Sequence, residues 1–167
     1  MDAAISRAEG LHAAGIAVTY KSNRRFWASD WETRGYRIRA NLCQVEAELL
    51  AIWQAHALVQ HTLGIPHKET SDRCTLTVVY TDCIRALWEL ERSEPILTAR
   101  MILDRTQQLR RHGVDLELHW CPEHRKVPGN ELADLVAKRA LRYSMKHDFI
   151  SVDQLYDQKQ RINQLIA

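Results

Sequence analysis

Hydrophobic and polar positions change their period along the chain, and each change predicts a different kind of element. Residues 15–21 alternate between apolar and polar side chains, which predicts a strand. A turn at 22–23 would lead into a return strand that ends near 36–39. From Gln44 the apolar residues recur at helical spacing, until the Gly-Ile-Pro sequence at 64–66 stops the helix. A hairpin followed by a long helix is therefore expected.

The second half of the chain alternates between strands and helices. Residues 75–81 are β-branched or aromatic almost throughout, as expected for a strand buried on both faces. The next strand is predicted at 115–121, where Pro122 ends it. Three helices are predicted around these strands: a short one near 84–88, one from 93 to 112, and one that begins at Pro128. This order predicts an α/β fold, in which helices cover a mixed sheet.

Length and composition indicate a single domain. The 167 residues, of which 46% are hydrophobic, suffice for one continuous core. We expect this domain to span residues 1–145. Ser151 and Gln154 form a possible capping box, which predicts a C-terminal amphipathic helix extension over 146–167.

Charge, cysteines and hydropathy exclude several classes of protein. The net charge of +2 does not by itself mark a nucleic-acid binder, so local basic clusters would have to supply that function. The four cysteines show no CxxC pair, so neither a zinc site nor a disulfide framework is indicated, and we expect buried thiols. No apolar run is long enough for a membrane span, and the first residues do not show the basic start and apolar stretch expected of a signal peptide. We expect a cytoplasmic or nuclear protein that is not secreted.

Three carboxylates occupy positions that are unusual for charged residues. Glu48 lies on or beside the apolar stripe of its helix, Asp82 follows the most apolar strand, and Asp134 lies in a helical strip of alanines. Burial of a carboxylate costs several kcal/mol unless a partner compensates it. Each residue also has an ordinary interpretation. Glu48 could lie on the surface, Asp82 could cap the following helix, and Asp134 could pair with Lys138.

If these carboxylates converge, a cation is needed to neutralise them, because like charges raise one another's pKa. Mg²⁺ is the favoured ion, since it binds a few carboxylates and leaves positions for water and phosphate. Mn²⁺ is an alternative. Two such ions about 4 Å apart would support phosphodiester hydrolysis. The pattern therefore predicts a two-metal nuclease.

Two segments near the end of the chain carry a specific pattern: residues 120–124 read WCPEH and residues 128–134 read PGNELAD. They resemble the signature loop and the final helix of the type 1 ribonuclease H family, and this combination is highly specific. Residues 80–82 resemble the strand that ends in a catalytic carboxylate, and 47–52 resemble the helix that carries another. Asp2 matches the family's first aspartate by its spacing from Gly15. The resemblance covers roughly residues 2–143.

The resemblance implies a ribonuclease H-like fold with a mixed five-stranded sheet flanked by helices. Its first strand would be truncated, because only Met1 precedes Asp2. The family's roles imply that four residues hold the two metal ions and that a fifth, His124, assists proton transfer or product departure. The implied metal ligands and catalytic carboxylates are Asp2, Glu48, Asp82 and Asp134. Asp2 could instead be a frayed terminal residue, and His124 an ordinary exposed loop residue.

The implied function is an endonuclease that hydrolyses the RNA strand of RNA/DNA hybrids. The sequence PGNE at 128–131 resembles domains that retrotransposon polyproteins carry beside a reverse transcriptase. A reverse transcriptase in the same polyprotein is therefore a possible partner. Two alternatives remain open. One is a degenerate, non-catalytic domain that binds nucleic acid or supports a reverse transcriptase. The other is an exonuclease or integrase of similar fold.

Overall fold

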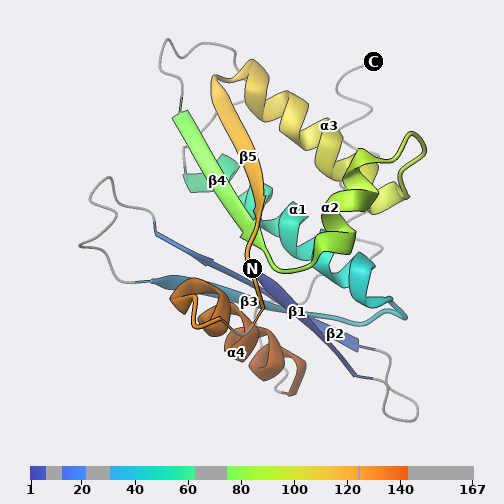
Figure 1. Ribbon diagram of the computed structural model, residues 1–167, viewed down its shortest axis with the longest axis vertical. Coiled ribbons are helices and arrows are strands. Elements are labelled where there is room, and N and C mark those ends of the chain that lie inside the picture. The colour runs from blue at the N-terminus through green and yellow to red at the C-terminus, as the bar shows by residue number, and fades with distance from the viewer. Residues whose placement is uncertain (7–12, 22–30, 63–74, 124, 143–167) are drawn as a thin grey trace.

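The computed structural model of the protein describes residues 1–6, 13–21, 31–62, 75–123 and 125–142. These ranges form a mixed α/β structure, as the sequence predicted (Figure 1). The elements are β1 (Asp2–Ser6), β2 (Ala13–Tyr20), β3 (Glu32–Ile38), α1 (Gln44–Thr62), β4 (Thr75–Thr81), α2 (Ile84–Glu91), α3 (Leu97–Arg111), β5 (Val114–Trp120) and α4 (Pro128–Arg142). The predicted helix over 146–167 and its boundary with 1–145 lie outside the described residues.

The described strands form two sheets, so the expectation of one five-stranded sheet is wrong for this part of the chain. β1, β2 and β3 form an antiparallel sheet in that order, and β4 pairs with β5 in parallel. Just before β1, the Met1 amino group donates a hydrogen bond to the Tyr80 carbonyl of β4 at 3.1 Å. From Asp2 onward the strand pairs with β2 instead, beginning opposite Ala17. The sheets therefore meet near Met1.

Helices cover the two faces of the three-stranded sheet. α1 lies on one face and α4 on the other, while α2 and α3 pack beside α1 (Figure 1). The central part of α1, residues 47–56, is buried all round, because it lies between the sheet and the neighbouring helices. Among the described helices, none is long and apolar enough to cross a membrane.

Helix α4 approaches β2 very closely. A Cβ atom added at Gly15 would lie 2.1 Å from the carbonyl oxygen of Ala137. Ala17, Ala133 and Ala137 form a small buried cluster at the same contact. Small side chains on both elements therefore bring α4 against the sheet, and this contact places the first turn of the helix near the start of β1 (Figure 1).

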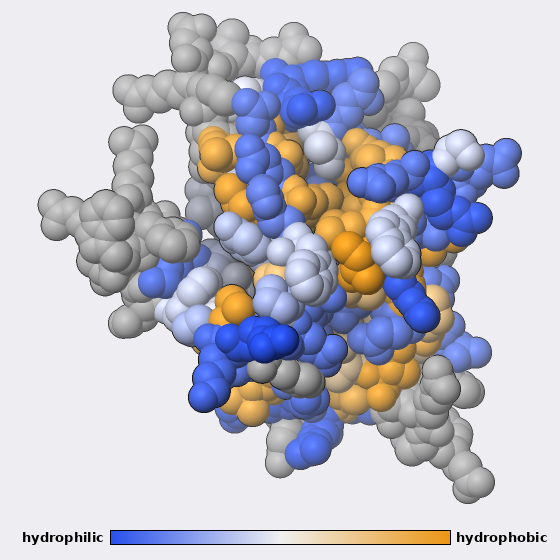
Figure 2. Space-filling view, in the orientation of Figure 1, coloured by the Kyte–Doolittle hydropathy of each residue, from blue (hydrophilic) through white to orange (hydrophobic). Residues whose placement is uncertain are grey.

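The outer face of the β4–β5 pair is exposed, so the prediction of a strand buried on both faces is wrong. Leu76, Val78 and Tyr80 point outward from β4 with exposures of 58%, 37% and 52%. The residues opposite the first two are Asp115 and Glu117, both exposed. Figure 2 shows the resulting apolar band over β4 beside a hydrophilic band over β5. The reason is that α1 and α3 cover only the inner face in the described structure.

The cysteines fit the prediction of buried thiols only in part. Cys121 is buried, Cys83 is partly buried, and Cys43 is exposed. Cys43 lies just before the first residue of α1, outside the part of the helix that packs in the core. Cys74 lies outside the described residues.

Candidate metal centre

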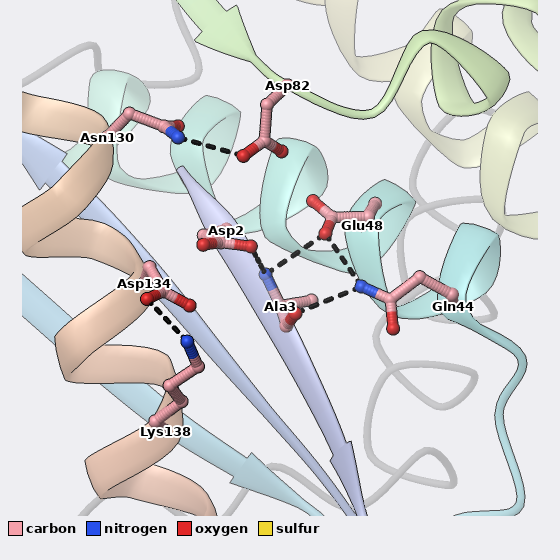
Figure 3. A network of polar contacts seen from close by, with 8 residues as sticks. All are labelled: Asp2, Ala3, Gln44, Glu48, Asp82, Asn130, Asp134 and Lys138. Atoms are coloured by element: carbon pink, nitrogen blue, oxygen red, sulfur yellow. Dashed lines mark hydrogen bonds and ion pairs between the residues drawn. The ribbon is translucent and has the colours of Figure 1, made fainter. Parts of the chain in front are cut away.

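Three carboxylates from different elements meet at one point, as the sequence predicted. Asp2 begins β1, Glu48 lies on α1, and Asp82 directly follows β4. One oxygen from each lies within 4.8 Å of the others (Figure 3). The three residues are far apart in sequence and come from both sheets and the helix between them. The centre therefore exists only in the folded chain.

A small hydrogen-bond network orients Asp2 and Glu48. The backbone N–H of Ala3 donates to Asp2 Oδ1 at 2.7 Å and to Glu48 Oε1 at 3.2 Å. Gln44, one helical turn before Glu48, donates through Nε2 to Glu48 Oε1 at 3.0 Å and to the Ala3 carbonyl at 3.0 Å. The start of α1 is thus tied to β1 by side chains that also fix one oxygen of Glu48 (Figure 3).

The second oxygen of Glu48 is buried and has no hydrogen-bond partner among the residues that the structure describes. Glu48 is only 2% exposed and Asp2 only 8%. Burial, together with the charge of Asp2, raises the pKa of Glu48 to about 8. Burial and the charge of Asp82 raise the pKa of Asp2 to about 7. In both groups, burial and the neighbouring carboxylates outweigh the N-terminal ammonium group, which lowers the two pKa values.

The donor set fits a hard divalent ion. Carboxylate oxygens are preferred ligands of Mg²⁺, and an octahedral site with Mg–O distances of about 2.1 Å places opposite ligands about 4.2 Å apart. At most one pair of the three oxygens can be opposite in an octahedron, and adjacent ligands are about 3.0 Å apart. The oxygens of Asp2, Glu48 and Asp82 lie within 4.8 Å of one another, so they must converge further to share one ion. The unpartnered Glu48 Oε2 provides a ligand atom that no other group uses. The cluster could therefore hold a metal ion.

Asp82 is held both at its backbone and at its side chain. The indole N–H of Trp120 donates to the Asp82 carbonyl at 3.0 Å. The side-chain amide of Asn130, in the first turn of α4, donates to Asp82 Oδ2 at 2.8 Å. Asp82 follows β4 directly but does not cap α2, because Cys83 occupies the N-cap position there and makes no side-chain cap bond. The cap interpretation of Asp82 is therefore wrong.

Among the predicted site residues that the structure describes, Asp134 is not part of this cluster. Asp134 lies on α4 and accepts a hydrogen bond from Lys138, with Nζ and Oδ2 2.6 Å apart. This is the ordinary pairing that the sequence also allowed. Asp134 nevertheless lies close enough for its charge to raise the pKa of Asp2. His124 lies outside the described residues.

Sequence reasoning missed two side chains that orient the carboxylates. Gln44 could have been found from its i, i+4 spacing to Glu48 on the predicted helix. Asn130 could not, because its contact with Asp82 joins the start of one helix to the end of a distant strand. Only the packing of α4 brings these two residues together.

Comparisons with known proteins add no assignment: neither a protein-family model nor a curated protein matches the chain.

Proposed function

We propose that the protein hydrolyses the RNA strand of RNA/DNA hybrids with the help of divalent metal ions. The observation that carries this proposal is the convergence of Asp2, Glu48 and Asp82 within 4.8 Å, with one buried carboxylate oxygen left without a partner. Surface carboxylates do not require a cation, whereas buried ones that repel each other need either a proton or a cation to remove the repulsion. A cation site of this composition suits phosphodiester chemistry.

The proposed ligands of the first Mg²⁺ ion are Asp2, Glu48 and Asp82, with Mn²⁺ as a substitute. Asp134 would contribute to a second ion after it exchanges Lys138 for the metal, since the two side chains are paired. When bound, the ions supply charge neutralisation at the phosphate and activate water. Glu48 and Gln44 keep the β1 end of the centre rigid, and Asn130 keeps Asp82 in place. His124 is proposed to assist proton transfer or product departure.

The choice of an RNA/DNA hybrid rests on the resemblance of residues 120–124 and 128–134 to ribonuclease H. That resemblance fits the arrangement of the centre, because the end of β5 and the first turn of α4 both contact Asp82. A neighbouring reverse transcriptase is the proposed partner. Selection of RNA over DNA would use contacts to the 2′-hydroxyl groups.

The test is cleavage of a labelled RNA/DNA hybrid in the presence and absence of Mg²⁺. We expect metal-dependent cleavage of the RNA strand that falls at least about 100-fold in Asp82→Asn and in Asp134→Asn, because each change removes a charged ligand. Asp104→Asn is the matched control, since Asp104 is exposed on α3 and is not one of the clustered carboxylates. Full activity in both ligand variants would refute the two-metal assignment.

A non-catalytic domain that binds nucleic acid or supports a reverse transcriptase is the second candidate. The observation that favours it is the Asp134–Lys138 pair, which neutralises the fourth carboxylate with a lysine. This candidate predicts that the protein binds a hybrid without cutting it and that Mg²⁺ does not raise its melting temperature. Cleavage by the purified protein that is lost in Asp82→Asn would exclude it.

A further inference from the structure

Asn130 is buried at the contact between α4 and the acidic centre. Its side chain is 7% exposed, and its Nδ2 group donates to Asp82 Oδ2 at 2.8 Å (Figure 3). Within the described ranges, the structure records no other side chain that donates a hydrogen bond to this carboxylate. The contact spans 48 positions of sequence and joins the first turn of α4 to the end of β4.

The amide of Asn130 is held from both sides. The thiol of Cys121 lies 3.7 Å from Asn130 Oδ1 and donates to it. Because the Asp82 carboxylate can only accept, these two contacts together orient the amide with its NH₂ group toward Asp82. The backbone N–H of Asn130 donates to the Val127 carbonyl at 3.0 Å, which fixes the start of the helix. The donor therefore points at Asp82 in one defined orientation.

A neutral donor has a specific advantage at this position. Lys138 binds Asp134 with a full positive charge, which competes with a metal ion for that carboxylate. The amide of Asn130 instead fixes Oδ2 of Asp82 without cancelling its charge, so Oδ1 stays available to a cation. Hydrogen bonds of this kind orient metal-binding carboxylates and raise their affinity for the metal ion.

We propose that Asn130 is a positioning residue that holds Asp82 in the orientation for metal binding, and that it acts through Asp82 without touching substrate. This inference rests on the proposed metal centre. It adds that the first turn of α4 contributes to metal affinity through Asn130, separately from Asp134. The same residue connects α4, which packs on the three-stranded sheet, to the β4–β5 pair.

The experiment compares Asn130→Ala and Asn130→Ser with the wild-type protein. Neither short side chain can replace the amide donor, and serine keeps a polar group next to Cys121. We expect Mn²⁺ affinity, measured by calorimetry, to fall about 10- to 100-fold in both variants. Cleavage at low Mg²⁺ should fall by a similar factor and recover when Mg²⁺ is raised about 100-fold, while KM for the hybrid stays unchanged. Asn41→Ala, at an exposed asparagine before α1, is the control.

The outcomes separate this inference from the proposed function. Unchanged Mn²⁺ affinity in a folded Asn130→Ala or Asn130→Ser protein overturns the positioning role. So does a loss of cleavage that no concentration of Mg²⁺ restores. If the wild-type protein binds Mn²⁺ but does not cleave the hybrid, the proposed activity fails, and weaker Mn²⁺ binding by the variants still supports the role of Asn130.

Discussion

At the scale of single residues, burial without an opposite charge governs the acidic centre. Asp2 and Glu48 have raised pKa values of about 7 and about 8, so each holds its proton in the folded metal-free protein at a pH where the unfolded chain has lost it. Protonation is the way in which a buried carboxylate avoids an unpaired charge. Metal binding is the other way, so protons and metal ions compete for the same oxygens.

The metal-free protein should therefore lose stability as the pH rises from about 4 to about 8. The folded-state pKa values of both carboxyls are raised, so their stabilising contribution is complete below pH 4 and disappears as the pH passes through 7 to 8. Each proton retained only by the folded state contributes a slope of about 1.4 kcal/mol per pH unit. Urea unfolding in EDTA at several pH values measures this slope.

Glu48→Gln is the informative variant for this prediction, because it cannot take up the proton. It should flatten the decline with pH and abolish most of the Mg²⁺-induced rise in melting temperature. In the wild-type protein that rise should be larger at pH 8 than at pH 6. A metal-free protein whose stability increases steadily up to pH 8 would contradict the assignment of the raised pKa values.

His56 should produce the opposite pH dependence. It is fully buried on α1, and burial together with the charge of Arg105 lowers its pKa to about 4. Because the unfolded chain binds a proton near pH 6.5 and the folded protein does not, stability falls as the pH drops from about 6.5 to about 4, by about 1.4 kcal/mol per pH unit. His56→Leu should lack this component when its unfolding curves are subtracted from those of the wild type.

The control for that comparison is His61→Leu, at an exposed histidine of the same helix. Its pH profile should match that of the wild type. Equal pH profiles for His56→Leu and the wild type between pH 4 and 6.5 would show that the folded protein protonates His56 as easily as the unfolded chain does.

At the scale of elements, the docking of α4 on β2 decides where Asn130 and Asp134 lie. The contact depends on backbone approaching backbone, since a Cβ at Gly15 would lie 2.1 Å from the Ala137 carbonyl. A Cβ atom added at Gly35 would lie 2.9 Å from a side-chain methyl of Val136, its nearest neighbour outside the adjoining residues. A methyl group on a side chain can move aside, whereas a helix carbonyl cannot move without the helix.

Gly15→Ala should therefore displace α4 and destabilise the protein by about 1–3 kcal/mol, the usual cost of overpacking. Gly35→Ala is the graded comparison and should cost less. Denaturant unfolding measures both, and Mn²⁺ calorimetry should show weaker binding in Gly15→Ala, because Asn130 moves away from Asp82 with the helix. Equal stability of the two variants would mean that the close contact at Gly15 is relieved elsewhere.

At the scale of the whole molecule, the acidic centre lies where the two sheets meet. Asp2 belongs to the three-stranded sheet and Asp82 follows β4, while α1 carries Glu48 between them. Two hydrogen bonds cross this junction: the Met1 amino group donates to the Tyr80 carbonyl, and the Asn130 amide donates to the Asp82 carboxylate. An ion bound to all three carboxylates would therefore link both sheets.

Mg²⁺ should slow amide hydrogen exchange in β1 and β4 together. At a concentration of about 100 Kd, an ion that binds only the folded state slows global opening by about 100-fold. Mass spectrometry of exchange with and without Mg²⁺ measures this effect, and Asp82→Asn should remove it from both strands. Slower exchange confined to one sheet would contradict an ion shared by all three ligands.

The sequence pattern determined the types of the described elements and many of their bounds, except for β1, which only the resemblance implied. The observed bounds lie within one or two residues of the predicted ones for α1, α4 and β5. The reason is that the spacing of apolar residues, the prolines and the glycines act on the backbone locally. Glu48 and Asp82 were identified by a local signal as well, a charged side chain within or beside an apolar segment. The third member, Asp2, was expected only from the resemblance, through its spacing from Gly15.

Only the tertiary structure decided how these pieces meet. The division into two sheets, the exposed face of β4 and the exposed Cys43 depend on which elements cover which surface, and periodicity cannot specify this. The same holds for the hydrogen bond between Asn130 and Asp82, which spans 48 positions, whereas the Asp134–Lys138 pair is local and the sequence allowed it. Hydrogen bonds across long stretches of chain form only after hydrophobic packing has brought their atoms within reach, so no local pattern encodes them.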